Sequence, residues 1–191
     1  MINHTPVYQG QYSTFSITEG DRLEVIIYRL GLWLAGLSFI AGSGLILWQG
    51  ATSTVINLLT PLFALFALGL GISLMTIHIY LKVLHRVIKI FWLIGVISAV
   101  IFAQQSSQPL ALFVYEHPFS LLGIGFTFAS LTGIFVKEAF CFNRLETKFL
   151  TFIVPFLLLG HLSGLLPING EKILLIMWAI GFLIFIVRKA I

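Results

Sequence analysis

The chain has 191 residues, of which 59% are hydrophobic and only 9% are charged. A soluble domain carries about 25% charged residues because its surface must be wetted, so this composition excludes a water-soluble globular protein and predicts one that meets lipid. The formal net charge of +4 does not indicate a nucleic-acid partner, because the basic residues stand at the ends of apolar segments. The single cysteine, Cys141, excludes an intramolecular disulfide and a CxxC pair for metal or redox chemistry.

Six apolar segments approach the length of about 20 residues that a helix needs to cross the hydrocarbon core. In chain order they are residues 29–48, 61–81, 87–103, 118–136, 149–166 and 173–188. The predicted fold is therefore all-α, a polytopic membrane bundle of six transmembrane helices that occupies residues 22–191. Residues 1–21 form a polar tail, whose pattern around Tyr8 and Tyr12 predicts an extended or hairpin-like segment. The chain outside the six spans is too short for an extramembrane catalytic domain.

Prolines indicate where two of the spans begin. Thr60-Pro61 predicts the start of the second span, with Pro at the first helical position. His117-Pro118 in the same way predicts the start of the fourth span. Residues 110–115, just before it, are apolar but too short to cross, so we expect an interfacial or re-entrant segment.

Two reversals of the chain receive different support from the sequence. Asn169-Gly170 predicts a tight turn, which would make the fifth and sixth spans antiparallel neighbours. Six spans also require a reversal between Lys82 and Lys89, yet this stretch contains no Gly or Pro. A single helix in place of the second and third spans would be about twice as long as the bilayer core is thick, so we retain the reversal.

The distribution of Lys and Arg predicts the orientation, because basic residues are retained on the cytoplasmic side. With both ends cytoplasmic, ten of the eleven basic residues fall on the inner side and only Lys172 on the outer side. The inner set is Arg22, Arg29, Lys82, Arg86, Lys89, Lys137, Arg144, Lys148, Arg188 and Lys189. This asymmetry supports an N-in/C-in topology and places residues 1–21 in the cytoplasm.

The histidines are the first candidates for cofactor or metal binding. His78 and His85 would share a helix face, and His161 lies inside the fifth predicted span. His161 is about 18 Å from the cytoplasmic start of its helix, whereas His78 is only about 6 Å from Lys82. This difference in depth disfavours a haem between them, so we predict no cofactor and no metal. His161 has two interpretations, a functional polar group in the membrane or an interhelical hydrogen bond.

Two charged segments are candidates for interaction. Lys82, His85, Arg86 and Lys89 could dock anionic headgroups or an acidic partner, although anchoring by side chains that reach the interface also explains them. The connection 137–148 is the densest in reactive groups, and its alternating charges should pair at the interface. Its candidate interaction residues are Lys137, Glu138, Arg144 and Glu146. We predict no catalytic residue, because nothing near Cys141 supplies a base to activate it.

Glycines recur in the second and fourth spans. Gly69 and Gly71 follow one Pro, Gly123 and Gly125 follow the other, and each span ends at a Lys. Small residues let helix backbones approach closely, so we expect these four positions at helix contacts. The same pattern resembles a two-helix repeat of the kind found in transporters. No Asp or Glu lies in the core of a span, which weakens proton-coupled transport.

Four strings carry a resemblance to a known family. They are VYQGQ at 7–11, IHIY at 77–80, KEAFCFNRLETK at 137–148 and LGHL at 159–162. Along nearly its whole length the chain resembles an uncharacterised family of integral membrane proteins known mainly from cyanobacteria. The resemblance implies a bacterial plasma membrane or thylakoid membrane and assigns no active-site residue.

These observations favour a non-enzymatic membrane protein that works by binding. It would be an accessory, assembly or scaffold factor that binds a membrane complex, a lipid or a pigment, with the lipid bilayer as its constant partner. The alternative is a small transporter or channel built from the two-helix repeats. An intramembrane enzyme ranks third, because the chain contains no HExxH, GxSxG or phosphate-loop motif.

Overall fold

The computed structural model describes residues 7–9, 14–16, 19–77 and 82–190. Two short strands, β1 (Val7–Gln9) and β2 (Thr14–Ser16), pair in antiparallel fashion. The helices are α1 (Glu19–Gln49), α2 (Ser53–Thr76), α3 (Lys82–Gln105), α4 (Leu110–Glu116), the 3-10 helix η1 (Pro118–Ser120), α5 (Leu121–Phe142), α6 (Leu145–Leu162) and α7 (Ile168–Ala190). Within the described residues, six helices are long and apolar enough to cross a membrane, which confirms the predicted all-α bundle.

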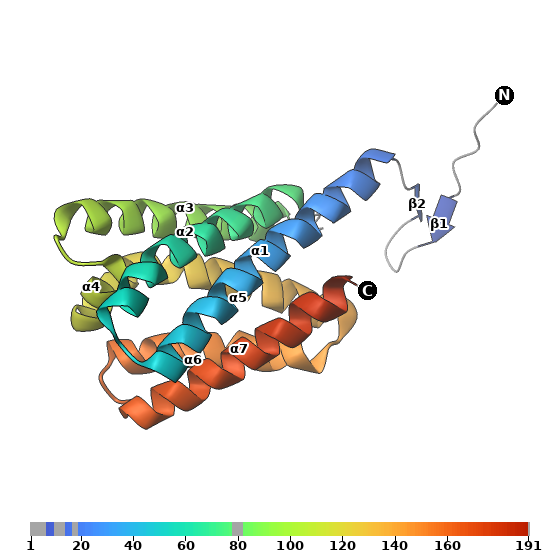
Figure 1. The fold of residues 1–191 in the computed structure, drawn as a ribbon. Helices are drawn as coiled ribbons and strands as arrows, with labels where there is room; N and C mark the ends of the chain where they lie inside the picture. Colours follow the sequence, from blue (N-terminus) through green and yellow to red (C-terminus); the bar gives the residue numbers. More distant parts are fainter. Residues whose placement is uncertain (1–6, 10–13, 17–18, 78–81, 191) are drawn as a thin grey trace.

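The six long helices run back and forth through the bundle (Figure 1). Helix α1 packs against α2 and α7, while α5 packs against α3 and α6. The start of α1 and the end of α7 lie at the same end of the bundle, as an even number of crossings requires (Figure 1). We call this the basic end, because Arg188 and Lys189 lie there, and the end that holds α4 the opposite end.

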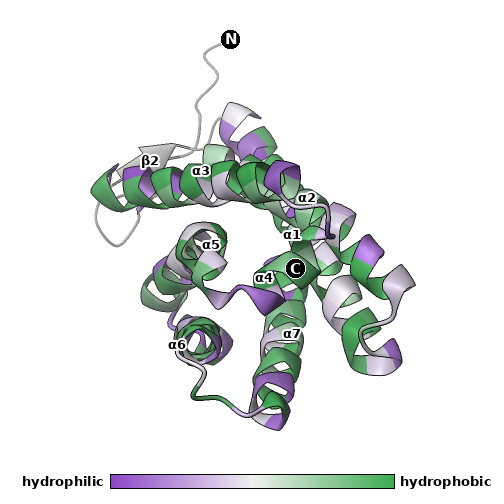
Figure 2. Ribbon diagram, turned by 90° about the vertical axis from the view of Figure 1, so that its left-hand side faces the viewer, coloured by the Kyte–Doolittle hydropathy of each residue, from purple (hydrophilic) through white to green (hydrophobic). Residues whose placement is uncertain are grey.

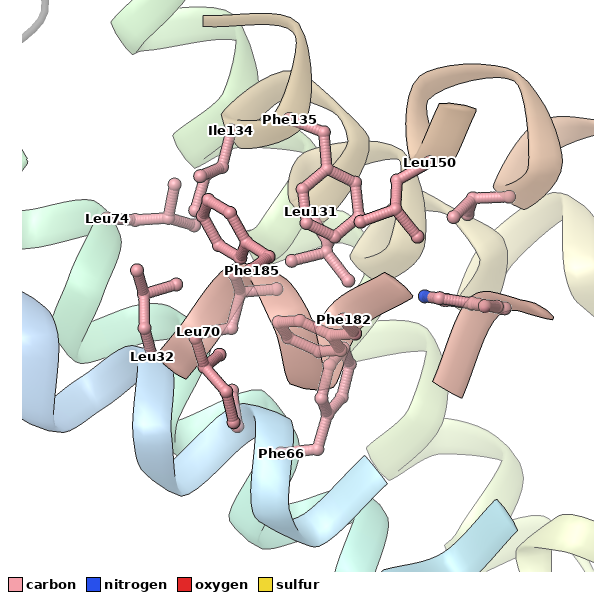
Figure 3. Close-up of a cluster of buried hydrophobic side chains, with 14 of the residues drawn as sticks. Leu32, Phe66, Leu70, Leu74, Leu131, Ile134, Phe135, Leu150, Phe182 and Phe185 are labelled. Carbon is pink, nitrogen blue, oxygen red and sulfur yellow. The ribbon is translucent and has the colours of Figure 1, made fainter. Parts of the chain in front are cut away.

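Aromatic and aliphatic side chains from α1, α2, α5 and α7 fill the centre of the bundle (Figure 3). Phe135 meets the edges of Phe182 and Phe185, with ring centroids 5.6 Å and 5.4 Å apart. Leu32 and Leu70 are fully buried beside them. The long helices consist mostly of hydrophobic residues (Figure 2), and many large hydrophobic side chains are exposed, as expected where the solvent is lipid.

Helix α2 begins earlier than Thr60-Pro61, so the predicted start of the second span is wrong. Thr52 is the N-cap, and its hydroxyl oxygen accepts a hydrogen bond from the Val55 N–H at 3.4 Å. Pro61 therefore lies inside the helix. Membrane helices tolerate an interior Pro because neighbouring groups can satisfy the freed backbone. The fourth predicted span does begin at Pro118, through η1.

The reversal predicted between Lys82 and Lys89 is also displaced. These residues are helical and form the start of α3, whereas α2 ends at Thr76 with Ile77 as its C-cap. Helix α2 thus ends before Lys82, and residues 78–81 lie outside the described part. The physical reason is that residues 82–89 contain no helix-breaking residue and therefore continue a helix.

The connection between α6 and α7 lies before Asn169-Gly170. Those two residues are in the first turn of α7. The turn is made by residues 163–167, where Gly164 has a φ of 66°, a conformation that favours Gly. Helices α6 and α7 are antiparallel neighbours, as predicted. Residues 110–115, predicted as an interfacial or re-entrant segment, lie in the short helix α4.

Small residues allow the closest helix contacts. A Cβ atom added at Gly69 would lie 2.6 Å from the Gly31 carbonyl oxygen on α1. Gly71 lies against the Trp92 ring on α3, and a Cβ at Gly123 would lie 2.8 Å from the Ser98 Cβ. These three predicted positions thus face neighbouring helices.

Gly125 differs from the other three glycines. The nearest atom to an added Cβ is Leu121 Cβ of the same helix, at 4.0 Å. Among the described residues nothing from another helix approaches it, so the expected close contact at Gly125 is not found.

Candidate interaction site at the basic end

A fully buried carboxylate, Glu138, lies near the end of α5 at the basic end. Its Oε1 accepts hydrogen bonds from the Lys137 ammonium at 2.8 Å and from the Tyr28 hydroxyl at 3.2 Å. Its Oε2 accepts from the Lys189 ammonium at 2.7 Å. Since Tyr28 belongs to α1 and Lys189 to α7, one carboxylate joins three helices.

The local sequence explains how these groups meet. Helix α5 continues beyond its apolar run and ends at Phe142, where Asn143 takes a left-handed conformation with a φ of 49°. Glu138 thus lies about one helical turn before the end of α5. Tyr28 is held by a second link, in which the Ser73 hydroxyl of α2 donates to the Tyr28 carbonyl oxygen at 3.0 Å.

An aromatic ring gathers the cations beside this carboxylate. The Lys189 ammonium lies 4.4 Å from the centroid of the Phe142 ring, and the Lys137 ammonium lies 5.5 Å from it. The Arg144 guanidinium is 5.6 Å away. Cations within about 6 Å of a ring face are attracted by its quadrupole. Phe142 is itself 52% exposed, so its ring is open to a partner, whereas the Lys137 and Lys189 side chains beside it are only 14% exposed.

A second ion pair borders the first. Arg188 donates to Glu146 at 2.9 Å, with the arginine side chain 56% exposed and the glutamate 8% exposed. Together with the groups around Glu138, this gives the basic-end cluster, which consists of Tyr28, Lys137, Glu138, Phe142, Arg144, Glu146, Arg188 and Lys189. Four basic and two acidic side chains leave the cluster with a positive surplus. The Nη1 atom of Arg144 is buried without a hydrogen-bond partner among the described residues.

The four predicted interaction residues of the connection 137–148 all lie in this cluster. Sequence reasoning missed Tyr28, Lys189 and Phe142 as members. The sequence pattern indicates only a topological anchor at Lys189, and Tyr28 precedes Glu138 by 110 residues. The only available signal was that Tyr28 is a polar ring beside an arginine at the start of an apolar run.

The other predicted basic segment has a different arrangement. The His85 Nε2 lies 2.9 Å from the Leu74 carbonyl oxygen, so the imidazole donates to the C-terminal turn of α2. Arg86 is exposed, and Lys82 begins α3. His78 lies outside the described residues. In the described part of the chain, no three His, Cys, Asp or Glu side chains come together as metal ligands would.

His161 lies at the opposite end of the molecule from the cluster. It stands in the last turn of α6 and not deep in a span, because α6 ends at Leu162. Its Nδ1 is 2.7 Å from the Glu171 carboxylate in the first turn of α7. The Tyr115 ring of α4 is 5.1 Å from the imidazole. This contact is an interhelical hydrogen bond, one of the two roles that the sequence allows for His161.

Comparison with known proteins agrees with this architecture. No curated protein and no solved structure shows significant similarity to the chain. Residues 72–191 match the family described as uncharacterised integral membrane proteins, DUF2301. The match covers more than half of the chain, including α3 to α7 and all of the basic-end cluster except Tyr28. The protein is therefore a member of the DUF2301 family of integral membrane proteins.

Proposed function

We propose that the protein acts by binding, as a non-enzymatic accessory, assembly or scaffold factor for a membrane complex, and that the basic-end cluster meets the partner. The observation that carries this proposal is the arrangement around Glu138. One buried carboxylate fixes α1, α5 and α7 relative to one another, while Arg188 and Phe142 are exposed at the surface of the same cluster. A rigid cationic and aromatic surface suits an acidic partner, since aromatic residues and Arg are enriched at protein interfaces.

The internal packing supports binding over transport. A transport path needs polar groups along the bundle axis. Here the axis is filled by large apolar side chains, among them Phe66, Phe135 and Phe182 (Figure 3). The charged groups around Glu138 pair with one another at one end of the bundle. This arrangement favours a scaffold and gives no specific support to the small transporter or channel.

The charge distribution supports an orientation for this surface. Nearly all basic residues of the chain belong to the basic end, and positive residues are retained on the cytoplasmic side. We therefore place both termini and the basic-end cluster in the cytoplasm, with the protein in a bacterial plasma membrane or a thylakoid membrane. The partner surface would then be a cytoplasmic or juxtamembrane acidic segment.

Site-specific crosslinking combined with gentle purification tests the proposal. A photo-crosslinking side chain at Phe142 should capture a defined large partner from native membranes, and the same side chain at Trp48 should not. Trp48 is a suitable control because it is 88% exposed and belongs to the opposite end. The partner should co-purify in stoichiometric amount.

Charge reversal at exposed residues tests partner binding without removing the buried contacts of Glu138. Lys148 is exposed, and its ammonium donates to the Asn143 side chain at 2.6 Å. Lys148→Glu and Arg188→Glu, as two separate variants, should each weaken partner retention. Lys172→Glu, at the opposite end, should retain the partner. If the wild-type protein purifies only with copies of itself, or if all three variants retain the partner equally, the proposal is wrong.

A further inference from the structure

The opposite end of the bundle contains a partly open cavity of about 260 Å³ between helices α1, α2, α4, α5 and α7. Its wall is largely aromatic and aliphatic and includes Phe39, Phe63, Phe66, Phe128, Leu62 and Val114. All five helices contribute the part that lies away from the basic end. The cavity is therefore separate from the basic-end cluster, and binding of a ligand there is independent of the proposed function.

The chemistry of the wall favours an apolar occupant over water. A buried water needs two to four polar partners. The Ser38 hydroxyl donates to the Leu34 carbonyl of its own helix at 2.7 Å. Among the residues the structure describes, two further hydroxyls belong to the wall, that of the buried Ser43 and that of Thr60, which has no partner. Two hydroxyls reach only the lower limit for one water, and the rest of the wall is apolar, so an apolar molecule is the better occupant.

The size of the cavity also leaves room for an occupant. Protein interiors are close-packed and contain few voids larger than a water molecule. A void of about 150 Å³ lined by Leu, Ile and Phe stays dry and accepts benzene. The present cavity is larger, at about 260 Å³, and has room for a segment of an alkyl chain.

The surroundings identify the source of such a chain. The helices that form the wall, apart from α4, are long and apolar enough to cross a membrane. The solvent outside them is then a bilayer, which supplies acyl chains at very high local concentration. We propose that this cavity binds one acyl chain of a membrane glycerolipid, inserted among Phe39, Phe63 and Phe128. The bound chain would complete the packing between α1, α2 and α5.

The fluorescence of Trp178 can report whether a lipid chain occupies the cavity. It is only 2% exposed, and its ring is 4.4 Å from Phe39 and 5.4 Å from Phe128, centroid to centroid. A variant with Trp33→Phe, Trp48→Phe and Trp92→Phe, which keeps Trp178, would be placed in phosphatidylcholine vesicles. The acyl chains would be brominated or unmodified. Brominated chains should strongly quench the fluorescence of Trp178. The external bilayer does not contact the indole, which is 2% exposed, so we attribute this quenching to a chain inside the cavity.

Filling the cavity should remove that quenching. Ala111 lies in the wall on α4, so Ala111→Phe should block the chain, whereas Ala64→Phe on the exposed face of α2 should leave quenching unchanged. Val114→Phe is a second filling variant in case the first does not fold. Native mass spectrometry should show one retained phospholipid in wild type and in Ala64→Phe, and at least a tenfold loss in the filled variants. Quenching of Trp178 that is absent, or equal in filled and open proteins, would overturn the proposal.

Discussion

The two ends of the bundle differ in the groups that they bury. At the basic end, Glu138 is fully buried and receives three donors from three helices. At the opposite end, apolar side chains surround a cavity, and the His161–Glu171 pair stays partly exposed, with 19% and 18% of the two side chains accessible.

The difference shows what each kind of contact can specify. A buried carboxylate has few acceptable arrangements, because an unpaired charge in a low dielectric is very costly. Charge therefore sets the relative positions of α1, α5 and α7. Apolar contacts are non-directional, so they permit several packings and also permit a void. We infer that the basic end is the more rigid half and the opposite end the more adaptable one.

The largest expected effect is all-or-none and concerns which end faces the cytoplasm. Cys141 is exposed at the basic end. A membrane-impermeant thiol reagent should leave it unlabelled in intact cells and label it after the membrane is opened. Ala51→Cys in a Cys141→Ser background should be labelled in intact cells, since residue 51 lies in the connection between α1 and α2. Labelling of Cys141 from outside would invert the proposed orientation.

The next effect tests the claim that charge fixes the basic end. Glu138→Leu removes the acceptor of Tyr28, Lys137 and Lys189 and leaves two ammonium groups close together. Breaking a buried pair in this way costs about 3–5 kcal/mol. A thermal-aggregation scan in detergent should show a clear drop in melting temperature.

The neighbouring ion pair supplies the control for that experiment. Glu146→Gln weakens the pair with Arg188, in which the glutamate is 8% and the arginine 56% exposed, and the amide oxygen of Gln can still accept a hydrogen bond from Arg188. The melting temperature should therefore fall less than in Glu138→Leu. Equal melting of Glu138→Leu and Glu146→Gln would show that the buried carboxylate does not hold the helices together.

A smaller effect is expected where packing depends on small residues alone. Gly69→Leu places a side chain against the α1 backbone, and overpacking of this kind costs about 1–3 kcal/mol. Gly125→Leu is the matched control, since no neighbouring helix lies within 4 Å of an added Cβ there. The same thermal scan should separate the two variants. If both melt like wild type, the close α1–α2 contact is not important for stability.

Much of the fold could be predicted because it depends on apolar length. The six spans follow from the thickness of the hydrocarbon core, and every one corresponds to a long helix. The boundaries at Pro61 and at residues 82–89 could not be predicted in the same way. Proline is a boundary signal in water but is tolerated inside membrane helices, and the end of α2 at Thr76 has no strong local signal.

The candidate site was predictable only in its local part. Lys137, Glu138, Arg144 and Glu146 lie on one short connection, so their density was visible in the sequence. Their partners Tyr28 and Lys189 are 110 and 51 residues from Glu138, and such pairings depend on which helices become neighbours. The cavity was equally invisible, because a void is a property of five helices together and of no single segment.

The Glu138–Lys189 bond also has a consequence for the order of events during translation. Tyr28 and Lys137 have been made by the time Glu138 leaves the ribosome, but Lys189 follows 51 residues later. At about 5–20 residues per second, the carboxylate waits about 3–10 s for its second ammonium group. Until α7 is synthesised, the nascent chain therefore holds Glu138 with its Oε1 paired to Lys137 and its Oε2 still without the Lys189 donor.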